Sequence, residues 1–167
     1  LTESGYTITS GAFVAGEGLA SITMAGSQTV VGSTFNTITG YKLKSNTNRK
    51  NYDIVTKSGI LTVTPVTDEI TVTIKGKRLA ALYSGDEQSV EGYTVDITGS
   101  DLYKECGIFT FTGTAKASRT HAGITYMGLD PEQFSNANVN FTNVKFVVAE
   151  DGMLTIHSRL ITLTSAS

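Results

Sequence analysis

The sequence has 167 residues, a length that allows one ordinary domain or two small ones. Hydrophobic residues make up 40% of it, so the chain can bury a core, and this composition disfavours wholesale disorder. Charged residues make up only 17% and the net charge is −2, with no long run of Lys or Arg, which disfavours a nucleic-acid-binding protein.

Alternation of apolar residues with Thr predicts half-buried antiparallel strands along the whole chain. The 26 threonines suit this role, because a β-branched side chain favours strands and its hydroxyl keeps the outer face of a sheet wet. A composition rich in Thr and Gly and poor in charge is typical of an extracellular β-protein. In chain order, the expected strand segments are 5–9, 22–29, 58–64, 69–74, 92–98, 109–116, 151–157 and 159–165.

Turns and one short helical segment separate these strands. The sequences KSGI at 57–60 and EDGM at 150–153 are typical of tight hairpins. The segment 130–134 predicts one helical turn, because Asp130 is a good N-cap and Pro131 suits the first helical position. The densest basic residues are interleaved with Asn and Ser and are expected in a solvated loop; they are Lys42, Lys44, Arg49 and Lys50.

The two halves of the chain repeat one pattern. SGILTVT at 58–64 matches DGMLTIH at 151–157, so that Leu61 corresponds to Leu154. Upstream, GYTIT at 5–9 matches GYTVDIT at 92–98, and Gly26 corresponds to Gly113. The closing segments are about six residues farther apart than the upstream ones, which predicts an insertion around 128–140 in the second copy.

The repeat pattern divides the chain into three parts: one truncated repeat at 1–65, one complete repeat at 66–158, and the opening strand of a third repeat at 159–167. The first repeat lacks the residues that correspond to 67–87. Leu1 is not an initiator Met and no signal peptide or anchoring tail is evident, so we expect a piece of a longer protein. No apolar stretch approaches the ~20 residues of a membrane span, so membrane insertion is not expected.

These motifs resemble the tandem Ig-like, MBG-type repeats of large Firmicutes cell-surface proteins. LYSGDEQ at 82–88 stands for the Tyr-Asp-Gly-Thr turn of that family, HAGITYMG at 121–128 for its Gly-Thr-Tyr element, and DGMLTI at 151–156 for its closing Gly-Thr-Leu-Thr-Val. The first repeat lacks the Tyr-x-Gly turn. The resemblance implies an all-β chain of two tandem Ig-like β-sandwich repeats, the first truncated. β-grasp-like modules with one short helix, placed at 130–134, are the alternative.

The resemblance also implies a function. It is that of a non-catalytic structural spacer or adhesin repeat, extracellular and attached to the surface or cell wall of a Gram-positive bacterium. Its partners would be neighbouring repeats of the same polypeptide and a host or cell-wall glycan or protein. The alternative is a glycan- or protein-binding module attached to a secreted enzyme or adhesin, with the 126–141 loop as the candidate surface. An exposed aromatic row on that loop would favour the binding module, and a loop packed on its own sheet would favour the spacer.

No catalytic, cofactor-binding or metal-binding residue is expected. The single cysteine, Cys106, cannot form an internal disulfide, and neither His121 in a turn nor His157 at a strand end makes a recognisable nucleophile–base pair with it. The adjacent carboxylates at 68–69, 86–87 and 150–151 are each only a pair beside a turn, so they are expected to be solvated rather than to bind calcium. Lys75 has no Asn on the closing strand with which to form an isopeptide bond.

Two structural expectations follow from the strand pattern. In the tail at 159–167, Ile161 and Leu163 alternate with Thr, so the tail is suited to bury one face and to pair along its edges. Because the first repeat lacks its opening strand, we expect the tail of one molecule to dock head to tail on the first repeat of another. The expected core of the complete repeat is Val72, Ile74, Tyr93, Val95, Phe109, Phe111, Val147, Leu154 and Ile156.

Overall fold

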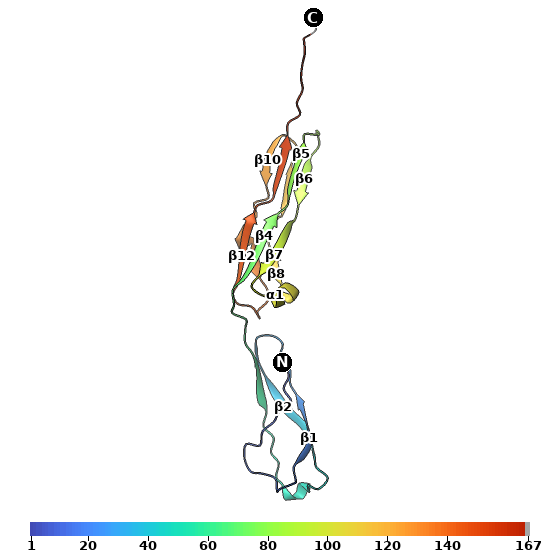
Figure 1. Cartoon of the computed structure of the whole chain (residues 1–167), viewed down its shortest axis with the longest axis vertical. Coiled ribbons are helices and arrows are strands. Elements are labelled where there is room, and N and C mark those ends of the chain that lie inside the picture. Colours follow the sequence, from blue (N-terminus) through green and yellow to red (C-terminus); the bar gives the residue numbers. More distant parts are fainter. Residues whose placement is uncertain (166–167) are drawn as a thin grey trace. The chain divides into compact units, whose positions relative to one another are not determined.

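The computed structural model describes residues 1–165 as an all-β chain with one short α-helix. It divides into two compact units, which are described separately: unit 1, Leu1–Pro65, and unit 2, which begins at Val66. The division after Pro65 falls where the sequence places the end of the first repeat. Figure 1 shows the strands of both units along the chain.

Unit 1 contains a single three-stranded antiparallel sheet in the order β1-β2-β3. Its strands are β1 (Leu19–Ala25), β2 (Gly32–Leu43) and β3 (Gly59–Val63), and a 3-10 turn, η1 (Arg49–Asn51), follows β2. The long strand β2 pairs with β1 through its second half and with β3 through its first half. Residues 1–18 and 52–58 belong to no strand.

Unit 2 contains ten strands in the described residues. They are β4 (Ile70–Gly76), β5 (Arg78–Leu82), β6 (Gln88–Glu91), β7 (Tyr93–Thr98), β8 (Phe109–Phe111), β9 (Lys116–Arg119), β10 (Gly123–Tyr126), β11 (Phe134–Asn136), β12 (Val144–Glu150) and β13 (Met153–His157). The helix α1 (Asp101–Cys106) follows β7, and the 3-10 turn η2 (Pro131–Gln133) precedes β11.

The opening and closing strands of unit 2 lie side by side and run parallel. β4 pairs with β12, and farther along the same two stretches of chain β5 pairs with β13. Each of the two parallel pairs has a third strand beside it. In the sheet β12-β4-β7 the third strand, β7, pairs with β4, and in the sheet β10-β13-β5 the third strand, β10, pairs with β13. This parallel pairing joins the stretch β4–β5 to the stretch β12–β13 (Figure 1).

The change of partners occurs where the two long stretches of chain meet most closely, at Gly76 and Gly152. A Cβ atom on Gly76 would lie 2.1 Å from the backbone nitrogen of Gly152, so neither strand has room for a side chain on this side of Gly76. The predicted hairpin at EDGM is therefore wrong, because β12 and β13 continue in one direction past Asp151. Only a glycine allows the backbones to approach this closely.

Unit 2 has two hydrophobic cores, one in each half. In the first core, sheet β12-β4-β7 packs on the two-stranded sheet β11-β8, and the side chains of Ile70, Val72 and Ile74 are fully buried. In the second core, Leu154 and Ile156 of β13 pack with Ala117 of β9. Burying one aliphatic side chain of this size contributes about 1.5–3 kcal/mol, so these strands supply much of the stability of the unit.

Most of the predicted core residues lie in these clusters, and two do not. Val95 is 39% exposed, because β7 is the edge strand of its sheet. Val147 lies outside both cores, because Phe146 pairs with Val72 and so shares its inward face. The remaining members are buried or packed against a core: Val72, Ile74, Tyr93, Phe109, Phe111, Leu154 and Ile156.

Strand pairing supports the internal repeat near the closing strands. Leu61 lies opposite Thr34 in unit 1, and Leu154 lies opposite Thr125 in unit 2. At the start of the same two ladders, Gly32 and Gly123 have nearly equal backbone φ angles of 137° and 139°. Upstream the copies differ, because Tyr93 begins β7 whereas the matching Tyr6 lies in no strand.

The helical segments differ in part from the expectation. The turn at 130–134 forms η2, with the Asp130 side chain accepting the Glu132 N–H and a capping box that includes Gln133. The α-helix lies elsewhere, at 101–106, so the expectation that 130–134 is the only place for a helix is wrong. Ser100 begins α1 by accepting the Tyr103 N–H at 3.2 Å, an N-cap that the strand pattern alone does not reveal.

Candidate functional site

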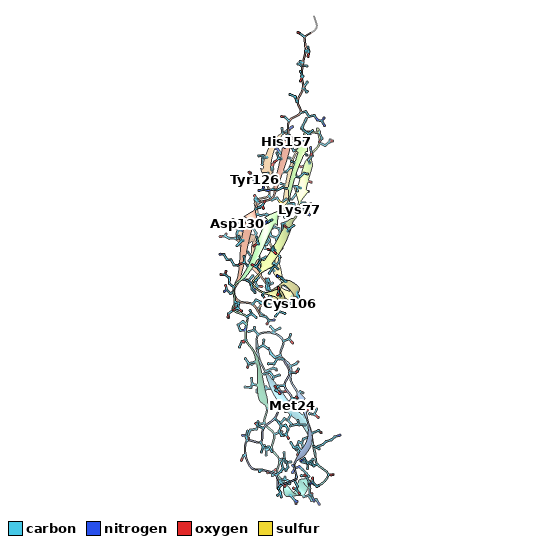
Figure 2. The ribbon with its side chains drawn as sticks, viewed as in Figure 1. Met24, Lys77, Cys106, Tyr126, Asp130 and His157 are labelled. Carbon is cyan, nitrogen blue, oxygen red and sulfur yellow. The ribbon has the colours of Figure 1, made fainter. Side chains whose placement is uncertain are left out.

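The thiol and the imidazoles lie apart. Cys106 is at the end of α1 and His157 at the opposite end of unit 2 (Figure 2). The ring of His121 stacks on Tyr83 at 6.3 Å, and the N–H of Tyr83 is bonded to the carbonyl oxygen of His157, so both histidines lie at the end away from Cys106. The exposed Cys106 thiol donates to the carbonyl oxygen of Leu102 at 3.0 Å. The structure does not bring these three side chains together.

The carboxylates singled out in the sequence have separate structural roles. Asp151 accepts the backbone N–H groups of Gly128 and Leu129 at 3.1 and 3.0 Å and so ties the loop after β10 to the closing strand. Glu150 lies 3.8 Å from Lys75 and 3.7 Å from Arg78 in exposed ion pairs across the parallel strands. Within residues 1–165, no three His, Cys, Asp or Glu side chains form a group that could hold a metal ion.

The turn that holds His121 is organised by an arginine. The Arg119 guanidinium donates to the carbonyl oxygens of His121 at 2.6 Å and Ile124 at 2.5 Å, and to the hydroxyl of Thr125 at 3.0 Å. These are charge-assisted bonds, which are among the stronger hydrogen bonds in proteins. The polar groups of this loop are therefore used to fold the loop itself.

The 126–141 loop packs on its own sheet. The side chains of Leu129, Phe134 and Phe141 are 8%, 5% and 2% exposed and belong to the first core of unit 2. Tyr126 and Val139 are the large exposed hydrophobic side chains of this loop. A row of exposed aromatic rings, which would indicate a glycan-binding surface, is not formed by the loop.

The asparagines of this loop bind protein groups rather than facing solvent. Asn136 donates to the carbonyl oxygens of Asn138 and Phe141 and accepts the hydroxyl of Tyr103 at 3.0 Å. Asn138 donates to the carbonyl oxygen of Cys106 at 3.0 Å, which ties the loop to the end of α1. Burial raises the pKa of the Tyr103 hydroxyl above its usual value.

The basic residues of unit 1 are exposed, as the sequence predicts. Lys42, Lys44, Arg49 and Lys50 surround the end of β2 and η1. The Arg49 guanidinium donates to the carbonyl oxygen of Tyr52, and the side chain of Asn48 accepts the Lys50 N–H at 3.0 Å. These contacts are those of a folded turn.

Unit 1 contains a groove of about 700 Å³. The inner face of β1 and β2 lines it, through Ile22, Met24, Ile38 and Tyr41. The unpaired segments 5–9 and 53–58 form its other walls. Figure 2 marks Met24 within unit 1. The sequence predicts that this repeat lacks its opening strand, but it does not locate the groove.

Comparisons with family models, with curated proteins and with solved structures give no match for this chain. None of the helices formed by residues 1–165 is long and apolar enough to span a membrane.

Proposed function

We propose that this chain is a non-catalytic structural spacer, or adhesin repeat, of a bacterial cell-surface protein. The parallel pairing of the opening and closing strands of unit 2 carries this proposal. Tension along a polypeptide reaches unit 2 at the start of β4 and at the end of β13. Because the stretch β4–β5 runs parallel to the stretch β12–β13, the tension slides the two stretches past each other and loads the hydrogen bonds of both ladders at once.

The opening strand is the best-anchored element of unit 2. β4 is bonded on both sides, to β12 and to β7, and its inward side chains Ile70, Val72 and Ile74 have no exposed surface. Sliding β4 would break both hydrogen-bond ladders and expose these three side chains in one step. A unit built in this way resists tension, as a stalk must.

The connection between the units is short. The N–H of Val66 donates to the carbonyl oxygen of Asn140 at 2.8 Å, and the Thr142 N–H donates to the carbonyl oxygen of Val66 at 3.1 Å. Asn143 reaches the carbonyl oxygen of Thr67 at 3.2 Å. The chain is thus fixed to unit 2 from Val66, directly after the end of unit 1, and this favours modules joined by short connections over modules joined by long flexible linkers.

We propose membership of the MBG-type repeats on the strength of the sequence motifs, with an extracellular, wall-associated location and neighbouring repeats as partners. The closing motif forms β3 in unit 1 and β13 in unit 2, and each is paired with an antiparallel strand. Of the Ig-like β-sandwich and the β-grasp-like module, the order of strands in the sheet favours the β-grasp-like module. In that order the opening strand lies between an antiparallel and a parallel neighbour, instead of at the edge of a sandwich.

One observation favours the alternative, a glycan- or protein-binding module. Phe35 lies opposite Ile60 and is 68% exposed; Tyr126, at the matching place in unit 2, lies opposite Met153 and is 58% exposed. Aromatic side chains at one register position in both units could bind sugar rings. A glycan array probed with the wild-type chain and with Phe35→Ala and Tyr126→Ala tests this: binding that both substitutions abolish would favour the binding module.

Single-molecule force spectroscopy tests the spacer. The chain is held by its two ends, and the unfolding of Ile70–His157 should release roughly 300 Å of chain at the highest force of the trace. The matched control uses the same protein with Cys106→Ser and Asp86→Cys, held at residue 86 and at the C-terminus. Because β5 and β13 end side by side, this geometry separates their bonds one at a time and should need a severalfold lower force. Equal forces in the two geometries would contradict the proposal.

A further inference from the structure

Unit 1 contains two segments whose counterparts in unit 2 are held together by β4. The segment 5–9 corresponds in sequence to β7, and the segment 51–57 corresponds to β12. In unit 2 these two strands are the neighbours of β4 on either side. Unit 1 has no counterpart of β4, and neither segment forms a strand there.

Most of the backbone of both segments is left without hydrogen-bond partners. Among residues 1–165, the N–H and C=O groups of 6–9 and 53–57 form no hydrogen bond. Both segments border the groove of about 700 Å³ described above. The groove therefore has two rows of free backbone groups, which are what an added strand requires.

The apolar residues at the floor of the groove form an incomplete hydrophobic core. Leu61 is the one buried hydrophobic side chain of unit 1, whereas the described part of unit 2 has ten. Ile22, Met24, Ile38 and Tyr41 are only half-buried where they line the groove. Asn36 also lines it, and its side-chain oxygen is buried without a hydrogen-bond partner among the described residues. In unit 2 the same kind of floor is covered by Ile70, Val72 and Ile74 of β4.

The chain carries a second segment with the pattern of β4. In the tail, Ile161 and Leu163 alternate with Thr162 and Thr164, as Ile70 and Val72 alternate with Thr71 and Thr73. The tail is anchored at Arg159, which donates to the carbonyl oxygen of Tyr83 at 2.6 Å. Beyond it, Leu160, Ile161 and Leu163 are 92%, 77% and 91% exposed, and residues 160–165 belong to no strand. Residues 166–167 of the predicted tail lie outside the described residues.

We propose that the groove of unit 1 is an acceptor site for a β-strand, and that the tail of a second copy of this chain occupies it. The inserted tail runs parallel to 53–57 and antiparallel to 5–9, as β4 runs between β12 and β7. Ile161 and Leu163 then cover Ile22 and Met24. Because the acceptor and the donor lie on different parts of the chain, the contact is head to tail and produces open chains of molecules.

Sedimentation velocity over a concentration series tests the proposal on the whole chain. The wild-type protein should form a ladder of oligomers that grows with concentration. The variant Ile161→Asp/Leu163→Asp should remain monomeric, because it places charge on the inward face. The matched control Thr162→Asp/Thr164→Asp places the same charge on the outward face and should associate like the wild type.

A peptide of sequence DEITVTIKG, taken from β4, provides a second readout. It should bind the tail-deleted chain and shift the backbone NMR signals of 5–9 and 53–57, while a scrambled peptide should not. A wild-type chain that stays monomeric throughout would overturn the proposal. So would oligomers that persist in Ile161→Asp/Leu163→Asp. Peptide binding that appears only after tail deletion, in a chain that is always monomeric, would place the tail in its own groove and overturn the intermolecular contact.

A cysteine pair tests the register. If Ile161 takes the place of Ile70, Ser165 lies opposite Ile8, as Ile74 lies opposite Val95 in unit 2. In a Cys106→Ser background, one protein carries Ile8→Cys and the other Ser165→Cys. Mixing equal amounts of them under oxidising conditions should give a disulfide-linked heterodimer in excess of the two homodimers combined. A statistical mixture of the three dimers would contradict the register.

Discussion

The close approach of Gly76 and Gly152 makes a single methyl group a severe perturbation of unit 2. In Gly76→Ala, the new Cβ would lie 2.1 Å from the nitrogen and 2.4 Å from the Cα of Gly152. Both contacts are with backbone, so no side chain can rotate away to relieve them. The parallel strands would have to separate at the point where β4–β5 and β12–β13 exchange partners.

The expected cost can be estimated from overpacked cores. Forcing one extra methylene into a packed interior usually costs 1–3 kcal/mol, and a clash with backbone belongs at the upper end, about 3 kcal/mol. For a unit of this size, that loss corresponds to a fall in the melting temperature of roughly 10–25 °C. It is a large share of the 5–15 kcal/mol that stabilises a typical domain.

Urea unfolding followed by circular dichroism and tyrosine fluorescence measures the effect, since the chain has seven tyrosines and no tryptophan. The control is Gly40→Ala in β2. A Cβ at this position meets no atom within 4 Å, so the substitution should leave the stability nearly unchanged. Gly152→Ala is a second comparison, because its Cβ would lie 2.1 Å from the side chain of Met127. Adding Met127→Ala removes this clash, so the double mutant should recover part of the lost stability. A Gly76→Ala protein as stable as the wild type would refute the close approach of the two backbones at Gly76 and Gly152.

Three further substitutions test the contacts of unit 2. Asp151→Ala leaves the N–H groups of Gly128 and Leu129 without their charged acceptor and should cost about 1.5–3 kcal/mol in urea unfolding; a loss under 0.5 kcal/mol would contradict this role. Ser100→Ala removes the N-cap of α1 and should cost about 1 kcal/mol, with Ser100→Asp retaining most of the stability. Because burial raises the pKa of Tyr103 above 10.0, its contribution is complete below pH 10 and is lost as the pH rises through the folded-state pKa. The urea midpoint should therefore fall above pH 10, and Tyr103→Phe should fall less steeply; equal slopes would exclude Tyr103 as the cause.

Local pattern predicted six strands of this chain, whereas the strands expected at 5–9 and 159–165 do not form. Alternation of Ile, Val and Phe with Thr placed β4, β7 and β8 correctly within a few residues, and the Asp-Pro pair placed η2. The repeat in the sequence also matched Leu61 to Leu154, and both side chains are buried. These features depend on neighbouring residues, which a single sequence shows directly.

The errors concern how strands choose their partners. Asp-Gly in EDGM has the composition of a hairpin turn, yet Gly152 serves a close approach between two long strands, which depends on Gly76 some distance away in the chain. Val147 and Phe146 are adjacent and both apolar, so alternation alone could not decide which faces inward. The helix α1 is only six residues long, and its packing depends on Tyr103 meeting Asn136 and Phe141.

Both proposals depend on one claim: the opening strand holds the repeat together, and unit 1 lacks it. Amide hydrogen exchange of the wild-type chain at a dilution where it is monomeric tests this claim directly. Amides of β4, β7 and β12 should exchange slowly, those of β1, β2 and β3 at intermediate rates, and those of 6–9 and 53–57 at the rates of unstructured chain. Slow exchange at 6–9 and 53–57 in the monomer, or fast exchange throughout β4, would contradict it.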